Sequence, residues 1–523
     1  MRPPVPALPE HCEVLGRLNE RQGANGQHYA IKFHLRLPTQ WNGRFFFEGG
    51  GGSNGTLGNA YGSLQGQQAQ TALGMGYAVV SQDSGHDNSA NNDPERNGPL
   101  THGFDPQARL DHGYNSYDQV TRTAKALIQL HYGRAPERSY FVGCSEGGRE
   151  AMLMSQRFPD AFDGILACAP GFQLPKAALF GEVWDTQVLA GLATRMGIYD
   201  KNGTPFLNKT FTDEDLALAS NAVLAACDGL DGVEDGMIQN FPGCTVEVIA
   251  KKLAEVTCKN PKRSSCLLPA QVDALQKIYA GAKTSKGENL YSSFPWDRGM
   301  GGLVGGSAAP DAYNMGWRVW KLGMYDAPVN NSINVSLGAL SITSVFMTPP
   351  VPTSTANGAP LKALLAVDLD RDGAKLNAVT AEYPVPVATY FMANSTDLAA
   401  FRRRGGKMLI VHGVSDPIFS INDTLHWYEE LNAANAGNAG EFVRLFAVPG
   451  MNHCSGGPAT DRYNAFAALV AWTEKSQAPD SIVAAAGPLT PWPGRTRPLC
   501  PYPRQARYVG SGSVEDAGNF LCK

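Results

Sequence analysis

The sequence predicts an α/β protein whose parallel sheet is covered by helices and whose chain carries one large insertion. Three observations lead to this prediction. Residues 30–158 alternate apolar strands with helix-forming segments, the regular period is lost between about 172 and 394, and the alternation returns over residues 407–474. Strands that alternate with helices indicate a parallel sheet covered on both faces. We therefore expect one discontinuous domain, residues 1–171 and 395–523, and a second domain, residues 172–394, that interrupts it.

The individual elements follow in order along the chain. Residues 30–37 alternate apolar and polar side chains as a half-buried strand does, and residues 117–132 place apolar side chains at helical spacing among good helix formers. The other expected elements are strands at 44–47, 77–81, 139–142, 407–411 and 443–448, and helices at 150–158, 423–431 and 463–474. The insertion is rich in Pro, Gly, Asn and Trp, and a lid inserted into one core explains it better than two consecutive domains do.

Length and composition restrict the class of protein. A chain of 523 residues exceeds the roughly 250–300 residues of a single core, so an insertion or a second domain is expected. The hydrophobic content of 43% with 18% charged residues is ordinary for a globular protein, and a net charge of -4 offers nothing to attract nucleic acid or an anionic membrane. No apolar run approaches the roughly 18 residues of a transmembrane helix. We expect a monomer without a nucleic-acid or membrane partner.

The ten cysteines indicate disulfides formed in an oxidising compartment. No CxxC…CxxC pattern or Cys/His cluster suggests zinc. Six of the cysteines occur as near neighbours in loop-like sequence: Cys227 with Cys244, Cys258 with Cys266, and Cys500 with Cys522. Cys168 lies in an apolar run and is expected to be a buried free thiol, whereas Cys12 has no obvious partner. We expect a secreted or periplasmic protein, and because residues 1–9 lack the apolar core of a signal peptide, we expect a leader to be absent from this sequence.

Gly143-Cys-Ser-Glu-Gly147 matches the G-x-S-x-G pattern of a nucleophilic serine. Alone the match is weak, because 57 of the 523 residues are glycine and Gly51-Gly-Ser-Asn-Gly55 matches as well. Ser145 follows an expected strand and precedes an expected helix, the setting that exposes a nucleophile above a sheet, whereas no helix start follows Ser53. We predict that Ser145 is the nucleophile, with an ordinary turn serine as the alternative interpretation of the motif.

The glycine run around Ser53 suits a different task. A loop without Cβ atoms can bring backbone N–H groups close to a developing oxyanion. We predict that the N–H groups of Gly52 and Glu146 form an oxyanion hole.

An acid and a base follow two later strands. Asp416 lies after the strand 407–411 at its carboxyl end, where α/β enzymes place reactive loops, and His453 follows the next strand. The order Ser, Asp, His along the chain is that of an α/β-hydrolase. His412 is the competing base, but it lies at a strand end before the acid and is expected to bond locally. We therefore predict a catalytic triad of Ser145, Asp416 and His453 on an α/β-hydrolase core.

Ser145 and His453 each have a cysteine as immediate neighbour, Cys144 and Cys454. A nucleophile and its base lie within hydrogen-bond reach, roughly 2.6–3.2 Å. That contact also brings the neighbouring cysteines near the Cα separation that a disulfide needs, about 4.4–6.8 Å. We predict a Cys144–Cys454 disulfide that clamps the catalytic pair.

Six stretches of the chain resemble the tannase/feruloyl esterase family. They are Trp41–Gly50, Asp105–Asp111, Gly113–Val120, Gly143–Glu150, Ser395–Arg402 and Val448–Pro458. Together they span nearly the whole chain, and the last is too long for a chance match. The resemblance implies an α/β-hydrolase core, a large lid that holds a calcium ion, and the disulfide between the neighbours of Ser145 and His453. It also implies the disulfides Cys227–Cys244, Cys258–Cys266 and Cys500–Cys522.

The implied calcium ion falls on the segment 228–238, Asp-Gly-Leu-Asp-Gly-Val-Glu-Asp-Gly-Met-Ile. Its carboxylates are hard oxygen ligands on a loop whose glycines allow sharp turns, which suits Ca²⁺ rather than zinc. The resemblance places on the ion the side chains of Asp228, Asp231 and Asp235 and the carbonyls of Val233 and Met237. A solvated acidic loop is the alternative. We expect a structural metal, and no organic cofactor.

The resemblance also suggests that Trp320 and Phe419 line the acyl pocket, although both could be ordinary core aromatics. In a family member that acts on a terephthalate monoester, a lid arginine holds the free carboxylate, in the segment that corresponds to residues 325–345. That segment contains no Arg or Lys here, and burying an unpaired carboxylate is costly. We therefore expect a neutral or phenolic aromatic acyl group.

Together these residues predict a serine carboxylesterase for small aromatic-acid esters of the terephthalate-monoester, feruloyl or galloyl type, acting through an acyl-enzyme on Ser145. An α/β-hydrolase peptidase is the enzymatic alternative. A non-catalytic, calcium-dependent binding protein is the alternative from another class, but it would not need all three members of the triad.

Overall fold

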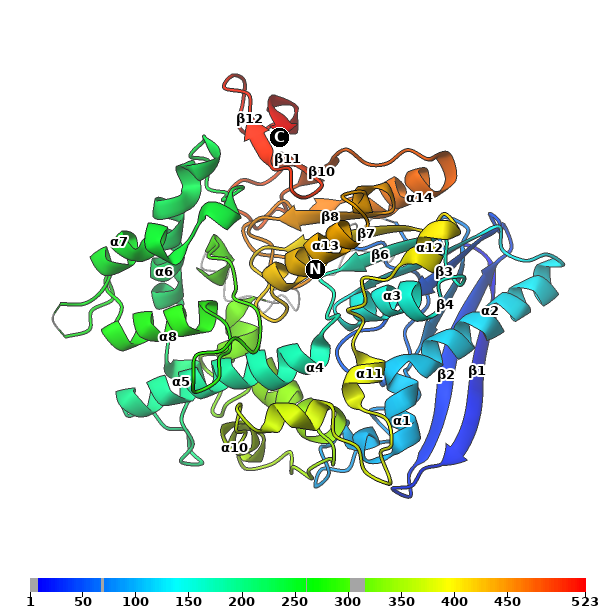
Figure 1. Cartoon of the computed structure of the whole chain (residues 1–523), viewed down its shortest axis with the longest axis horizontal. Coiled ribbons are helices and arrows are strands. Elements are labelled where there is room, and N and C mark those ends of the chain that lie inside the picture. Colours follow the sequence, from blue (N-terminus) through cyan, green and yellow to red (C-terminus); the bar gives the residue numbers. More distant parts are fainter. Residues whose placement is uncertain (1–7, 67–69, 260, 302–315) are drawn as a thin grey trace.

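A computed structural model describes residues 8–66, 70–259, 261–301 and 316–523 (Figure 1). Its centre is an eight-stranded sheet in the order β1-β2-β4-β3-β5-β6-β7-β8. The strands are β1 (His11–Gln22), β2 (His28–Pro38), β3 (Arg44–Glu48), β4 (Ala78–Gln82), β5 (Arg138–Cys144), β6 (Gly164–Cys168), β7 (Lys407–Gly413) and β8 (Val443–Val448). Strand β2 runs antiparallel to both of its neighbours, β1 and β4. The six strands β4, β3, β5, β6, β7 and β8 run parallel to one another. The predicted α/β fold is confirmed.

Side chains alternate between the two faces of the sheet, and each face has its own apolar core. Along β3, Phe45 and Phe47 pack with helices on one face, whereas Phe46 packs on the other. Helices α2 (Ser116–Tyr132), α3 (Glu146–Arg157) and α13 (Ile421–Ala434) cover the first face, and α14 (Ala465–Lys475) covers the second. This alternation, with a period of two residues, explains why the strand sequences are apolar almost throughout.

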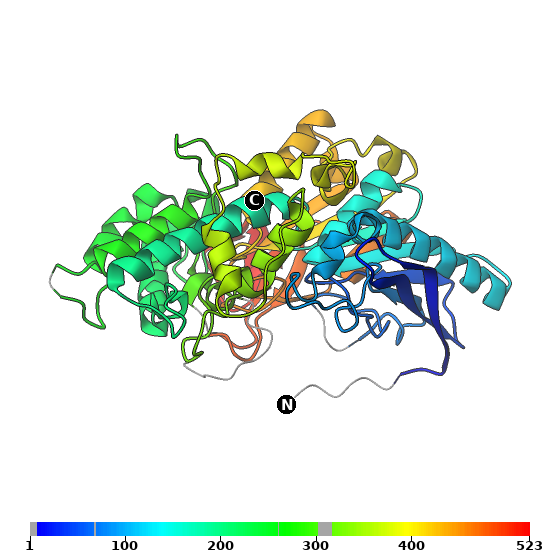
Figure 2. The same cartoon turned by 90° about the horizontal axis from the view of Figure 1, so that it is seen from below.

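The chain between β6 and β7 is helical in its described part and contributes no strand to the eight-stranded sheet there. Its helices are α4 (Leu174–Lys176), α5 (Val183–Met196), α6 (Asp213–Cys227), α7 (Val246–Glu255), α8 (Pro269–Tyr279), α9 (Ala339–Ser341), α10 (Ala359–Leu365), α11 (Val387–Phe391) and α12 (Ala399–Arg403). Figures 1 and 2 show α5 to α8, in green, as a lobe to one side of the sheet. The exact domain boundaries stay a prediction.

Most elements lie within a few residues of where the sequence predicts them, and the exceptions have physical reasons. Strand β1 was not predicted because it is an edge strand with charged side chains that pairs with β2 alone. Helix α1 (Pro106–Leu110) and the small C-terminal strands are too short to show a period. These strands are β9 (Arg462–Tyr463), β10 (Ile482–Ala485), β11 (Thr496–Leu499), β12 (Ala506–Tyr508) and β13 (Phe520–Cys522).

Three short disulfides join the pairs that the resemblance implied, Cys227–Cys244, Cys258–Cys266 and Cys500–Cys522. Cys168 is a free, fully buried thiol, as predicted, and Cys12 is free and exposed. Within the described residues, no helix is both long enough and apolar enough to cross a membrane.

Candidate active site

Ser145 occupies the sharp turn between β5 and α3, with φ 64° and ψ -121°. A non-glycine residue rarely adopts this conformation, and such strain clusters at functional sites. The flanking glycines make the turn possible by allowing close backbone contacts. A Cβ on Gly143 would lie 2.5 Å from the carbonyl oxygen of Gly147, and a Cβ on Gly147 would lie 2.6 Å from that of Gly50. The G-x-S-x-G pattern is therefore a steric requirement of this turn.

The glycine loop after β3 is tied to helix α3, whose first residue is Glu146. The N–H of Gly147 donates to the carbonyl of Gly50 at 3.1 Å, and the N–H of Gly50 donates to the carboxylate of Glu150 at 3.0 Å. The amide of Glu146 belongs to the first turn of the helix, whose N–H groups have no partner within the helix. Gly52 lies on the same pocket as Ser145 and Glu146. The predicted oxyanion donors, Gly52 and Glu146, thus border the same pocket as Ser145.

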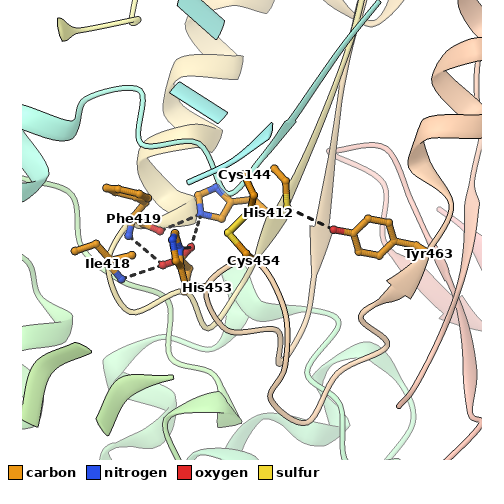
Figure 3. The surroundings of a disulfide bond; sticks show 9 residues. Cys144, His412, Ile418, Phe419, His453, Cys454 and Tyr463 are labelled. Carbon is orange, nitrogen blue, oxygen red and sulfur yellow. Dashed lines mark hydrogen bonds and ion pairs between the residues drawn. A yellow bond between two sulfur atoms is a disulfide. The ribbon is translucent and has the colours of Figure 1, made fainter. Parts of the chain in front are cut away.

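His453 and Asp416 form a buried pair on the loops that follow β8 and β7. His453 Nδ1 lies 2.7 Å from Asp416 Oδ2, and the backbone N–H groups of Ile418 and Phe419 donate to Asp416 Oδ1 (Figure 3). Burial alone would raise the pKa of Asp416, but the charges of His453 and His412 and their hydrogen bonds hold it well below its ordinary value. Asp416 is therefore an ionised carboxylate that orients the His453 ring.

The other ring nitrogen of His453, Nε2, is buried and has no hydrogen-bond partner within the described residues. The rings of Trp320 and Phe419 pack against this imidazole edge to face, with centroids 5.2 and 5.4 Å away. Both rings also line the pocket that contains Ser145. A direct hydrogen bond between Ser145 and His453 is not formed here, and such bonds often tighten only when substrate binds.

His412, the competing base, is engaged at both ring nitrogens. Its Nδ1 lies 3.0 Å from Thr424 Oγ1, and its Nε2 lies 3.0 Å from the carbonyl oxygen of Phe419 and 3.4 Å from Asp416 Oδ2. A fully buried histidine with both nitrogens occupied cannot accept a proton from a substrate group. His412 instead bonds locally, as predicted, and its Nε2 lies close to the carboxylate of Asp416.

A disulfide joins Cys144 to Cys454, with a Cα separation of 6.1 Å (Figure 3). It connects the residue before Ser145 to the residue after His453, although the two cysteines are 310 positions apart. Strand pairing places Cys168 of β6 opposite Cys144, so a free thiol packs beside this disulfide. The predicted disulfide between the turn that carries Ser145 and the loop that carries His453 is confirmed.

The pocket above Ser145 has about 550 Å³ of empty space, part of it open to solvent. Five residues proposed from sequence meet on it: Gly52, Ser145, Glu146, Trp320 and Phe419. The other lining residues come mostly from the insertion and are Leu174, Ala178, Glu182, Leu337, Gly338, Ser341, Val345 and Phe346, with Ser53, His112 and Ile418 from the rest of the chain. A largely apolar wall with a few polar groups is typical of a site for a small aromatic ligand.

A buried ion pair in the first turn of α3, directly after Ser145, was not predicted. The carboxylate of Glu146 receives the guanidinium of Arg149 and lies 3.5 Å from His112 Nε2. Burial would raise the pKa of Glu146, but Arg149 and His112 lower it to about 2. Arg149 also donates to the backbone carbonyls of Gly113 and Phe391, so it joins helix α3 to two other segments. Glu146 and Arg149 are three residues apart in α3, and this i,i+3 spacing of opposite charges is the sequence signal that could have predicted the pair.

Three histidines, His86, His102 and His112, gather behind this ion pair. The rings of His86 and His102 stack at 3.6 Å with an angle of 17°, and His102 Nε2 lies 3.1 Å from His112 Nδ1. A metal ion lies in the plane of each imidazole that binds it, and no position satisfies two stacked parallel rings. Burial lowers the pKa of all three histidines. We therefore interpret them as neutral side chains that pack against one another in the core.

The acidic loop after α6 carries the three aspartates expected at calcium. Backbone N–H groups of Val233 and Gln239 donate to Asp231, and Gly236 and Gly232 take positive φ where the loop turns. Burial raises the pKa of Asp231 to about 6, and the nearby carboxylates of Asp235 and Asp228 add to this rise. Arg497 pairs with Asp235. The aspartates of this loop are oxygen donors of the type that Ca²⁺ takes, although Asp235 is paired with Arg497 and Asp228 accepts backbone N–H groups.

Comparison with known proteins agrees with this geometry. A family model described as "Tannase and feruloyl esterase" matches residues 12–523. The chain belongs to the tannase and feruloyl esterase family. It is 48% identical to the mono(2-hydroxyethyl) terephthalate hydrolase of Piscinibacter sakaiensis, over 99% of this chain and 85% of that protein. Members of this family are carboxylic ester hydrolases, and so is this protein.

Solved structures of the same family have the same fold. An esterase from Aspergillus oryzae superposes with a TM-score of 0.71 at 23% identity, over 98% of this chain and 90% of that one. Feruloyl esterase B from Aspergillus oryzae superposes with a TM-score of 0.68 at 21% identity, over 99% and 96% of the two chains. At such low identity the superpositions show the fold alone. The shared fold is an α/β-hydrolase-like core with helices.

Proposed function

We propose that this protein hydrolyses small aromatic-acid esters through an acyl-enzyme on Ser145, with His453 as the base and Asp416 as its partner. The observation that carries the proposal is the state of His453: Nδ1 is bound to Asp416, Nε2 has no partner within the described residues, and the next residue is bonded to the neighbour of Ser145. The named substrates of the relatives, a mono(2-hydroxyethyl) terephthalate hydrolase and feruloyl esterases, are aromatic-acid esters.

Each step then falls to a particular group. His453 Nε2 takes the proton of Ser145 Oγ as the oxygen attacks the ester carbonyl, and Asp416 stabilises the imidazolium that forms. The N–H groups of Gly52 and Glu146 receive the oxyanion. His453 returns the proton to the departing alcohol, and a water activated by the same nitrogen hydrolyses the acyl-enzyme.

The acyl group lies among the aromatic and aliphatic side chains of the insertion, with Trp320 and Phe419 flanking the reacting carbon. The pocket supports a neutral or phenolic ring better than one with a free carboxylate. Its lining residues include Glu182 but no Arg or Lys.

We also propose that Ca²⁺ occupies the acidic loop, held by the side chains of Asp228, Asp231 and Asp235 with the carbonyls of Val233 and Met237. There the ion would neutralise the mutual repulsion of the carboxylates and stabilise the fold. The four disulfides support an oxidising environment, so we place the protein in the periplasm or outside the cell.

A substrate panel tests the function. We expect hydrolysis of methyl ferulate, methyl gallate or mono(2-hydroxyethyl) terephthalate, little action on peptide anilides, and loss of all turnover in Ser145→Ala. Preferential cleavage of the anilides would favour the peptidase alternative. A folded wild-type protein that cleaves neither class would contradict the proposal and favour a binding protein.

A further inference from the structure

Glu182 is a carboxylic acid on the wall of the acyl pocket that the proposed reaction does not use. It ends the helical turn Ala177–Glu182, which also supplies Ala178 to the pocket. The side chain is only 6% exposed, and its Oε2 atom has no hydrogen-bond partner within the described residues. A buried polar atom without a partner is rare and costs stability, so it calls for an explanation.

The carboxyl group of Glu182 fits beside the pocket because its neighbour there, Gly338, has no side chain. Gly338 lies directly against the carboxyl group, and a Cβ at position 338 would collide with Glu182 Oε2. Only glycine is therefore compatible with the carboxyl group in its present position. Gly338 itself lines the pocket, so the carboxyl group and the cavity are adjacent.

Among the described residues, the one cation that acts on Glu182 is already engaged by another acid. Lys321 is close, but its ammonium is bound to Asp185 and lies over the ring of Phe294, 4.7 Å from the centroid. Tyr291, the third titratable group nearby, is neutral because burial raises its pKa well above the ordinary value. One lysine thus faces two acids, and it can balance the charge of only one of them.

The charge state of Glu182 follows from this arrangement. Burial raises the pKa of Glu182 to about 8, Lys321 opposes the rise, and Asp185 adds to it. At neutral pH the side chain is a carboxylic acid, which can both donate and accept a hydrogen bond.

A second polar group on the pocket wall is also without a partner in the described part of the chain. The indole Nε1 of Trp320 is buried, and Trp320 is 7% exposed. An indole N–H can only donate. Two lining groups without a partner in the described residues are therefore available to a ligand: the indole of Trp320, which donates, and the carboxyl group of Glu182, which can donate or accept.

We propose that Glu182 determines acyl-group selectivity, because its carboxyl group forms a hydrogen bond with a hydroxyl group on the aromatic ring of the substrate. This inference rests on the proposed function and goes beyond it by naming the residue and the ring substituent. A phenolic hydroxyl donates one hydrogen bond and accepts another, which matches the carboxyl group and the indole. An unsubstituted ring leaves both groups unpaired, and a ring carboxylate meets no free cation among the lining residues.

Matched ester pairs test the proposal. The measured quantity is kcat/KM for methyl 4-hydroxycinnamate or methyl 3-hydroxycinnamate divided by kcat/KM for methyl cinnamate. Comparing this ratio between variant and wild type cancels the intrinsic reactivity of each ester. We expect Glu182→Leu to lower the ratio about 10- to 100-fold for at least one hydroxyl position. Glu182→Gln, whose amide also donates and accepts, should keep it within about threefold.

Gly338→Ala is the second variant, because it displaces the carboxyl group without removing it and should also lower the ratio. Glu288→Gln, at an exposed glutamate remote from the pocket residues in the sequence, is the matched control. Turnover of p-nitrophenyl acetate, whose acyl group has no ring, checks that each variant is an active esterase. An unchanged ratio in both Glu182→Leu and Gly338→Ala, with acetate turnover retained, would overturn the role of Glu182. Absence of all turnover in the wild type would instead overturn the proposed function.

Discussion

At the scale of single residues, the site depends on one histidine whose two nitrogens have different surroundings. Asp416 holds Nδ1, which fixes the tautomer, and Nε2 has no hydrogen-bond partner within the described residues. The nucleophile and the base are useful only together, because each step needs both. Their removal should therefore not be additive.

We expect Ser145→Ala and His453→Ala each to lower kcat by at least about 1000-fold, and the double variant to be no slower than the worse single variant. The measurement is steady-state hydrolysis of a p-nitrophenyl ester, with melting temperatures to show that each variant is folded. If Ser145→Ala kept a tenth of the wild-type kcat, Ser145 would not be the nucleophile.

Glu182 makes a second prediction at this scale, about stability and pH. Its folded-state pKa, about 8, lies above the ordinary value of 4.5. Between these values the folded protein keeps a proton that the unfolded chain has released, so the contribution of Glu182 to stability falls as pH rises. Above about pH 8 both states are ionised and the loss is complete.

Glu182→Gln cannot titrate, so its melting temperature relative to wild type should rise by about 2–5 °C between pH 5 and pH 8.5. Differential scanning calorimetry across this range measures the change, and Glu288→Gln provides the control for an exposed glutamate. A difference between Glu182→Gln and wild type that does not vary with pH would mean that Glu182 is ionised throughout.

At the scale of elements, the loops that follow the strands carry the site, and the acidic loop after α6 is the one for which we propose a bound ion. Burial raises the pKa of Asp228 and Asp231, and neighbouring carboxylates add to the rise, so a cation in the loop would favour their ionised form. An ion that binds only the folded protein stabilises it by mass action.

We expect EGTA to lower the melting temperature by about 3 °C or more, and Asp231→Asn to remove this response to calcium. Asp326→Asn, at an exposed aspartate of the insertion, should leave the response unchanged. Equal melting curves with EGTA and with millimolar calcium would count against an ion in the loop.

The elements also show how far sequence can predict the site. Ser145, Asp416 and His453 could be predicted because each lies within five residues of the end of a strand, and the order of strands in an α/β sheet brings those ends together. Glu182 and His112 could not be predicted as pocket residues, because one lies in an irregular helical insertion and the other in a short helical turn. Their positions depend on tertiary packing between segments, which leaves no period in the sequence.

At the scale of the whole molecule, two parts of the chain far apart in sequence share one sheet, and the Cys144–Cys454 disulfide joins them at the site. The two ends are 310 residues apart, and the chain-entropy estimate for so long a loop is on the order of 5 kcal/mol. The disulfide also sets the distance between Ser145 and His453, where a shift of about 1 Å can cost roughly 100-fold in rate.

We therefore expect Cys144→Ala/Cys454→Ala to lose more activity than its lower stability explains when it is assayed well below its melting temperature. The paired variant Cys258→Ala/Cys266→Ala is the matched control. It removes a disulfide between cysteines only 8 positions apart and should keep its kcat. If both variants retained wild-type kcat, the disulfide would have no positioning role.

The free thiol of Cys168 beside this disulfide has a consequence for the life of the protein after it unfolds. Only a thiolate attacks a disulfide, and burial raises the pKa of Cys168 to about 12, so in the native state exchange is suppressed. Unfolding removes that protection, so Cys168 joins the already exposed Cys12 as a free thiol in the same chain as four exchangeable bonds. In a Cys12→Ser background we expect heating and cooling at pH 9 to yield scrambled, inactive isomers, while the same cycle at pH 4 or in Cys12→Ser/Cys168→Ser restores activity. Equal recovery of activity at both pH values would show that Cys168 takes no part, and shelf life would then be limited by aggregation instead.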